Sequence, residues 1–269
     1  MNDPQWKTLV AAVRGESISP LPTAFIIDSP WLPNWAGHTI LDYFTSEHIF
    51  LEDNLKAIRA FPEAIFLPGF WSEYGMCTEP SAFGAVSMWG EDEFPFAKKV
   101  LLSPAEVERL EKPNPRKHGL LPFVVKRLQH LQPEIEAVGH KIRFAVARGP
   151  LNIASFLMGT PEFLEATKTH PELMHRLLDL VTDFLVEWIA YQREVFPSID
   201  GILLLTTSSA SSAAATARPS LCPICSALTM PTLPSSSSTT TRPARPARRC
   251  LPRPASTCST SAHSTPSTT

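Results

Sequence analysis

Residues 141–150 read Lys-Ile-Arg-Phe-Ala-Val-Ala-Arg-Gly-Pro, and this stretch decides the fold. Four consecutive apolar residues precede an arginine and a Gly-Pro pair that ends the run. A short apolar run bounded by turn residues is typical of a strand buried on both faces of a parallel sheet. We therefore predict a buried strand here, followed immediately by Arg148.

Similar runs on both sides extend this prediction along the chain. Apolar runs at residues 23–28, 64–67 and 200–205 predict three further strands. Helical patterns or helix starts lie between them, at residues 6–14, 47–60, 120–138, 160–162 and 171–196. Buried strands that alternate with helices predict βαβ units, a parallel sheet and the α/β fold class.

The choice within the α/β class depends on which motifs the sequence contains. No Gly-x-Gly-x-x-Gly or phosphate-loop pattern occurs, which removes the main support for a nucleotide-binding open sheet. The pattern favours a (β/α)8 TIM barrel, of which residues 1–205 supply about four strands, roughly the N-terminal half.

Candidate site residues follow the ends of the predicted strands, where barrels and open sheets build their sites. Asp28 ends the first strand and is predicted to be catalytic, with a helix cap or a loop hydrogen bond as the alternative. Arg148 is predicted to hold an anionic substrate, with a salt bridge at the barrel rim as the alternative. The predicted substrate-binding residues are Trp31, Trp71, Glu73, Asn152 and Phe156.

Further interpretations of these loops stay open. Trp31, Trp35 and Trp71 would suit a platform for a flat ring, or they pack within a lid. His38 and Glu73 could act as acid, base or ligand. Cys77 could ligate a metal, but a lone cysteine is more often a small apolar filler, and we predict no metal site.

A resemblance to a known family rests on several segments in order. Residues 149–159 read Gly-Pro-Leu-Asn-Ile-Ala-Ser-Phe-Leu-Met-Gly, and residues 161–164 read Pro-Glu-Phe-Leu. Residues 170–178 read His-Pro-Glu-Leu-Met-His-Arg-Leu-Leu, and Asp-Gly-Ile follows at 200–202. Together with Ala-Ala-Val-Arg-Gly-Glu at 11–16, these segments resemble the uroporphyrinogen decarboxylase family over roughly residues 5–205.

The resemblance implies a (β/α)8 barrel and one of two chemistries. The namesake enzyme of porphyrin biosynthesis removes carboxylates from a tetrapyrrole without a cofactor. The resemblance to this enzyme implies a tetrapyrrole-like small-molecule substrate. Protonation of a ring would create a cation that acts as an electron sink, and Asp28 or a carboxylate of the second half would stabilise this cation. Arg148 would anchor the carboxylates of the substrate. The alternative is a corrinoid-dependent methyltransferase, with a corrinoid protein as partner and zinc holding a thiolate.

The sequence departs from the family pattern at two places. The decarboxylase carries arginines after its first strand, whereas residues 28–35 here read Asp-Ser-Pro-Trp-Leu-Pro-Asn-Trp. A tyrosine of the family aligns with Phe156, which has no hydroxyl group. The resemblance to the methyltransferase branch implies a His-x-Cys pair in the second half of the barrel.

The composition changes abruptly near Leu205. Residues 1–205 hold all 26 acidic and 18 of the 24 basic residues, a net charge of −8. Residues 206–269 contain six arginines, nine prolines and 28 serines or threonines, but no glycine, valine or phenylalanine. We therefore expect residues 206–269 to form a separate, disordered tail, because so few apolar side chains cannot offset the entropy of ordering, about 1–2 kcal/mol per residue.

The tail is consistent with a single-base frameshift near Leu205. Codons for Asp-Asp-Leu-Ile-Gly-Phe-Val-Gly, read one base late, can give the Thr-Thr-Ser-Ser-Ala-Ser-Ser-Ala of residues 206–213. We then expect a truncated chain with an unpaired sheet edge, in which the activity belongs to the intact parent. A fragment without activity is thus a third hypothesis, beside the decarboxylase and the methyltransferase. The nucleotide sequence across codons 200–210 tests the proposed frameshift.

The remaining features exclude several other classes. Arginines between 242 and 253 and the Cys222–Cys225 pair are explained by the shifted frame, so we predict no nucleic-acid partner and no tail metal site. No signal-peptide pattern occurs at residues 1–7, and no apolar run approaches about 18 residues, so we expect no membrane segment. Only Cys77 precedes the tail, which favours a reducing cytoplasmic compartment.

Overall fold

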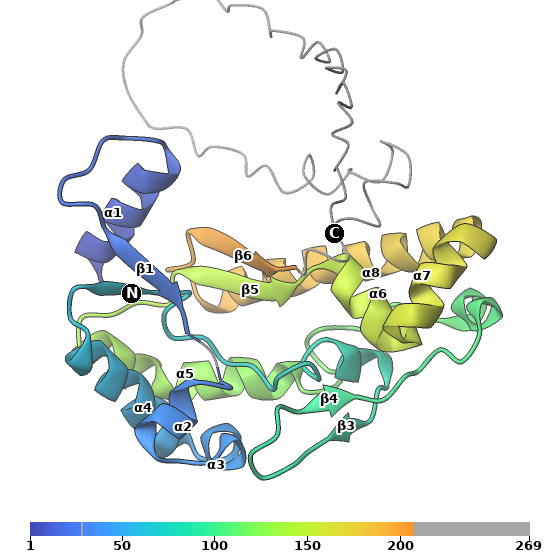
Figure 1. Cartoon of the computed structure of the whole chain (residues 1–269), viewed down its shortest axis with the longest axis horizontal. Helices are drawn as coiled ribbons and strands as arrows, with labels where there is room; N and C mark the ends of the chain where they lie inside the picture. Colours follow the sequence, from blue (N-terminus) through green and yellow to red (C-terminus); the bar gives the residue numbers. More distant parts are fainter. Residues whose placement is uncertain (28, 207–269) are drawn as a thin grey trace, which may run out of the picture. The chain divides into compact units, whose positions relative to one another are not determined.

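A computed structural model describes residues 1–27 and 29–206 of the 269-residue chain, all within the first of its two compact units, Met1–Leu228. Figure 1 shows helices and short strands alternating along this part of the chain. The longer helices are α1 (Asp3–Val13), α4 (Glu47–Ala60), α5 (Leu121–Ala137), α6 (Pro150–Met158), α7 (Thr160–Thr169) and α8 (Pro171–Val195). The predicted alternation of strands and helices is confirmed, and residues 206–269 stay a prediction because almost all of them lie outside the described residues.

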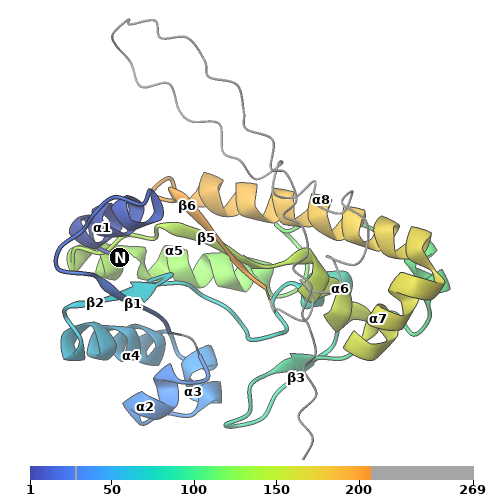
Figure 2. The same ribbon diagram turned by 45° about the horizontal axis from the view of Figure 1, so that its top comes forward.

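The predicted strands form two parallel pairs. Strand β1 (Thr23–Ile26) pairs with β2 (Ala64–Leu67), in the register that sets Thr23 opposite Ala64. Strand β5 (Phe144–Arg148) pairs with β6 (Gly201–Leu205), with Arg148 opposite Leu205. Figure 2 shows α8 running along β5 and β6. Parallel pairing was expected, but within residues 1–27 and 29–206 no strand pairing joins β2 to β5.

Side chains occupy the edge of β5 that faces away from β6. The side-chain amide of Gln192 on α8 accepts a hydrogen bond from the backbone N–H of Val146 and donates one to its carbonyl oxygen, both at 3.0 Å. Glu79 accepts from the backbone N–H of Arg148 at 3.0 Å. These groups take the bonds that a neighbouring strand would otherwise make, which explains why one continuous sheet is not formed there. The half-barrel therefore remains a prediction.

Strand β1 departs from the prediction in its burial. Residues 23–28 were expected to form a strand buried on both faces, yet the four residues of β1 are exposed. Phe25 and Ile26 are 55% and 60% exposed. The physical reason is that β1 has one strand partner, β2, in the described part of the chain, so its second edge and part of its surface stay uncovered.

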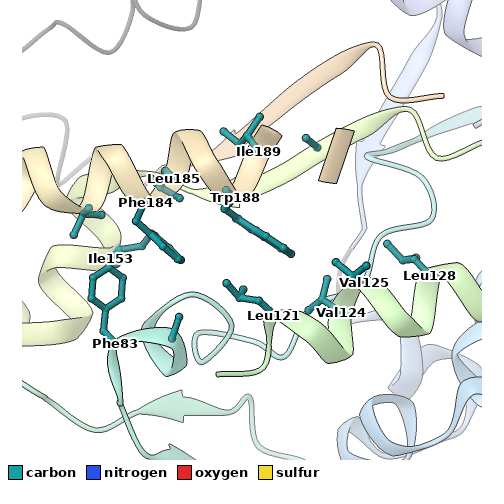
Figure 3. Close-up of a cluster of buried hydrophobic side chains, with 14 of the residues drawn as sticks. Phe83, Leu121, Val124, Val125, Leu128, Ile153, Phe184, Leu185, Trp188 and Ile189 are labelled. Carbon is teal, nitrogen blue, oxygen red and sulfur yellow. The ribbon is translucent and has the colours of Figure 1, made fainter. Parts of the chain in front are cut away.

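The apolar core lies mainly between α8, α5, α6 and the strand β5. Figure 3 shows Trp188 and Phe184 of α8 projecting toward the side chains of α5 and toward Phe83. Trp188 and Leu121 are almost completely buried, and the rings of Phe83 and Phe184 lie edge to face, 4.9 Å apart. The apolar stripe predicted for residues 171–196 thus packs inward, as helical spacing requires.

Several short elements lie between the longer helices and the parallel strands. They are α2 (Leu32–Ala36), α3 (Ile40–Thr45), the 3-10 helices η1 (Pro80–Phe83) and η2 (Pro104–Arg109), and a hairpin of β3 (Ser87–Met88) with β4 (Phe96–Ala97). The backbone of α3 is held by the hairpin loop, where Asp92 accepts a hydrogen bond from the N–H of Ile40. No helix among the described residues combines the length and apolar character needed to cross a bilayer.

Candidate functional site

Arg148 lies at the carboxyl end of β5 and is the centre of a buried ion-pair cluster. Its guanidinium Nη2 donates to Glu73 Oε2 at 2.6 Å, and Nη1 donates to Glu79 Oε2 at 3.2 Å. The side chains of Arg148, Glu73 and Glu79 are 8%, 5% and 3% exposed. Two carboxylates thus enclose one cation, away from solvent.

Each carboxylate of the cluster is held at both oxygens. Ser29 Oγ donates to Glu73 Oε1 at 2.7 Å, and the N–H of Arg148 donates to Glu79 Oε1. Charge-assisted hydrogen bonds of this kind are stronger than neutral ones and fix the geometry of both partners. The cluster therefore joins the loop after β1, the loop after β2 and the end of β5.

The cluster contains one basic and two acidic side chains. Burial opposes ionisation of Arg148, but Glu73 and Glu79 outweigh burial and raise the pKa of the guanidinium above its usual value. With both glutamates ionised, the three side chains carry one net negative charge. The positive charge of Arg148 is therefore already compensated within the protein.

The carboxyl end of β6 meets the start of α6 beside this cluster. The N–H of Gly149 donates to the carbonyl oxygen of Leu205 at 2.9 Å, and Asn152 Nδ2 contacts the same oxygen at 3.4 Å. A Cβ at position 149 would lie only 2.6 Å from the side-chain methyl carbon of Thr206, so glycine leaves room for that methyl group. Asn152 is buried and Phe156 half-buried on α6.

The structure brings together only some of the predicted site residues. Arg148 and Glu73 are in direct contact, and Asn152 lies four residues after Arg148, in the first turn of α6. The salt bridge considered for Arg148 is present. Asp28 lies outside the described residues, so its catalytic role stays a prediction, as do the roles assigned to the other residues.

The predicted tryptophan platform is divided. Trp31 and Trp35 stack with ring centroids 5.3 Å apart and an interplanar angle of 20°. Trp71 instead lines a small cavity with Phe144, Phe196 and other apolar side chains. Trp31 is 41% exposed, so part of this pair remains accessible to solvent.

His38 and Cys77 have separate partners. His38 Nδ1 lies 2.9 Å from Asp53 Oδ1, and burial raises the pKa of Asp53 although the contact with His38 opposes this effect. Burial also raises the pKa of the Cys77 thiol, which favours its neutral form. Across residues 1–27 and 29–206, no three His, Cys, Asp or Glu side chains are grouped so that they could hold a metal ion.

Three residues with a structural role near the site were not predicted from the sequence: Ser29, Glu79 and Gln192. Glu79 lies six residues after Glu73 in the same loop, so paired carboxylates in one loop were an available signal. Gln192 interrupts the apolar stripe of α8 four residues after Trp188, and a lone polar residue on a buried face requires a partner.

The sequence model of the family described as uroporphyrinogen decarboxylase (URO-D) matches residues 5–198. The chain belongs to the uroporphyrinogen decarboxylase family. Among solved structures, a methyltransferase from Methanosarcina mazei matches with a TM-score of 0.59 and 18% sequence identity, over 76% of this chain. The chain spans 59% of that methyltransferase, and at this identity the likeness concerns the fold alone. No curated protein matches the sequence.

The resemblance to the uroporphyrinogen decarboxylase family, predicted over roughly residues 5–205, is therefore confirmed by a match over residues 5–198. The family match ends at residue 198, close to the point where the composition changes. The cluster around Arg148 lies inside the matched region, at the strand ends where this class of fold builds its sites.

Proposed function

We propose that this member of the uroporphyrinogen decarboxylase family has a methyl-transfer type of site rather than a tetrapyrrole decarboxylase site. The observation that carries this proposal is the compensated charge of Arg148. Removal of carboxylates from a tetrapyrrole requires cations that are free to bind several substrate carboxylates. Arg148 is instead buried between Glu73 and Glu79, and a polyanionic substrate would meet a cluster with net negative charge.

The loop after β1 supports the same proposal. Residues 28–35 contain no arginine, so this loop supplies none of the cations that the decarboxylase uses there. Phe156 cannot donate the hydrogen bond that a tyrosine would give. A small neutral or thiol-bearing substrate does not need these groups.

The chain's own residues would position this substrate. The bonds of Glu73 and Glu79 to Arg148 hold the loop after β2 against the end of β5, and Asn152 projects from the first turns of α6 beside them. Fixed side chains at strand ends lower the entropic cost of orienting a substrate. The proposed partner is a corrinoid protein, which would supply or accept the methyl group.

The resemblance to the methyltransferase branch implies a zinc ion that holds a thiolate. The described residues provide no group of three suitable ligands, and Cys77 is a buried thiol with a raised pKa. These residues therefore do not fit a zinc site.

Two assays separate the candidate chemistries. We expect the frame-corrected protein to consume methylcobalamin in the presence of a thiol acceptor and to form no coproporphyrinogen from uroporphyrinogen. Formation of coproporphyrinogen would overturn the proposal in favour of decarboxylation. The 269-residue chain is assayed in parallel with circular dichroism during urea unfolding, because a missing cooperative transition together with no activity would support the inactive fragment.

A further inference from the structure

An apolar groove lies outside the Arg148 cluster. It has a volume of about 340 Å³ and is formed by α3, the loop after β2, the residue after β3 and the start of α5. Its aromatic lining residues are Phe44, Tyr74, Trp89 and Phe123. The volume is near the lower end of the range of about 300–1,000 Å³ that is usual for small-molecule sites.

Three of these rings form a continuous aromatic wall. The ring of Trp89 lies edge to face against Phe44 at 5.9 Å and against Tyr74 at 6.1 Å between centroids. Phe44 and Tyr74 are in tilted contact at 5.8 Å. Trp89 is 41% exposed, and Phe123, which also lines the groove, is 61% exposed. Such walls favour a planar ring, which gains offset-stacked or edge-to-face contacts.

A buried cation lies behind this wall. Arg127 on α5 donates through Nη2 to the carbonyl oxygen of Phe44, and its guanidinium carbon lies 5.1 Å from the centroid of the Tyr74 ring. It also lies 5.3 Å from the centroid of the Phe50 ring. Phe44 and Tyr74 therefore belong both to the groove and to the surroundings of Arg127.

Arg127 differs from the other buried arginines in its partners. Arg148 and Arg143 each contact two carboxylates, whereas no ion pair of Arg127 occurs in the part of the chain that the structure describes. Arg127 is 5% exposed and its Nη1 is buried without a hydrogen-bond partner. An unpaired buried donor on a charged group is costly, so an acceptor from outside the protein would be strongly favoured there.

We propose that this groove binds a small planar aromatic anion such as an aromatic carboxylate. The ring of the ligand lies against Trp89 and Phe44, and its carboxylate accepts a hydrogen bond from the free Nη1 of Arg127. Because Arg127 does not itself line the groove, the half-buried ring of Tyr74 turns aside when the ligand enters. The inference is independent of the methyl-transfer proposal, since it concerns a different set of residues.

Benzoate is the probe, and benzyl alcohol is its neutral counterpart. Each is titrated into the full 269-residue chain by isothermal calorimetry and by tryptophan fluorescence. We expect saturable binding of benzoate, at least tenfold tighter than that of benzyl alcohol. Trp89→Phe keeps an aromatic wall but removes most of the fluorescence change, whereas Trp31→Phe, which alters the stacked pair with Trp35, leaves that change in place.

Arg127→Met should bring the affinity for benzoate down to that for benzyl alcohol. If Arg127→Met shows no cooperative unfolding, the variant is not folded and its affinity is not informative. The preference of the unmodified chain for benzoate and the result for Trp89→Phe then test the proposal. Equal affinity for the two probes, absence of saturable binding, or a fluorescence change that persists in Trp89→Phe would overturn the proposal. Self-association that Phe123→Ser abolishes, without benzoate binding, would also overturn it and assign the groove to a second copy.

Discussion

The side-chain amide of Gln192 and the backbone of Val146 exchange two hydrogen bonds, each of 3.0 Å, between α8 and β5. Both residues are buried. The amide presents one donor and one acceptor in the same orientation as a peptide group of a neighbouring strand. A helix side chain thus completes the hydrogen bonding of a strand in the middle of the core.

Gln192→Leu should destabilise the chain strongly. The substitution keeps a side chain of similar size but leaves the N–H and the carbonyl of Val146 buried without partners, which costs about 2–4 kcal/mol in the free energy of unfolding. Urea denaturation followed by circular dichroism measures the change. Gln132→Leu is the matched control, because the amide of Gln132 contacts Glu136 on the exposed surface of α5 and should change stability by less than about 0.5 kcal/mol. Equal effects of the two substitutions would contradict the pairing.

Arg148→Met should also reduce stability, through a different cause. Removal of the cation leaves Glu73 and Glu79 buried side by side, and breaking a buried ion pair in this way typically costs about 3–5 kcal/mol. The same measurement on Arg116→Met serves as comparison, because Arg116 and Glu194 form a solvent-exposed pair whose removal should change stability little. A loss of stability for Arg148→Met no larger than for Arg116→Met would mean that the cluster does not brace the strand ends.

His140 should make the folded state sensitive to acid. Burial, and secondarily the amino group of Met1, lower the pKa of His140 to about 4, whereas an unfolded histidine has a pKa near 6.5. Its neutral form is therefore favoured in the folded protein, and stability is lost as the pH falls from about 6.5 to about 4. Partial solvent screening limits the loss to about 1–2 kcal/mol.

His140→Gln should remove this part of the pH dependence. The free energy of unfolding is measured at several pH values between 7 and 4.5 for both proteins. His130→Gln is the control, because His130 is largely exposed and contacts Glu47 on the surface. If the unfolding curves of the unmodified chain and His140→Gln shift in parallel with pH, the buried imidazole is not the source of the acid sensitivity.

The sequence predicted the elements of the fold well where the pattern is local. The helix expected at 47–60 and the strand expected at 64–67 match Glu47–Ala60 and Ala64–Leu67, because apolar periodicity within one element is set by neighbouring residues. The pairing of strands depends on residues far apart in the chain. The exposure of Phe25 and the separation of β2 from β5 arise from such contacts, which periodicity does not encode.

The candidate site was predictable in part for the same reason. Arg148 and Glu73 were selected because they follow strands, and they meet in one ion pair. Their enclosure by Glu79 and Ser29 could not be predicted, since it depends on how two loops fold against β5. Gln192 was visible only as a polar residue within an apolar stripe, and its partner Val146 lies 46 positions away.

The strand pair β5–β6 has one edge whose backbone groups are hydrogen-bonded to side chains. Gln192 and Glu79 bond the outer edge of β5, whereas in the described part of the chain β5 is the only strand beside β6. An added strand, whether from the same polypeptide or from another, can therefore pair only with the free edge of β6. The sheet can be extended on this side alone. Complementation with a separately produced second half would have to begin at β6.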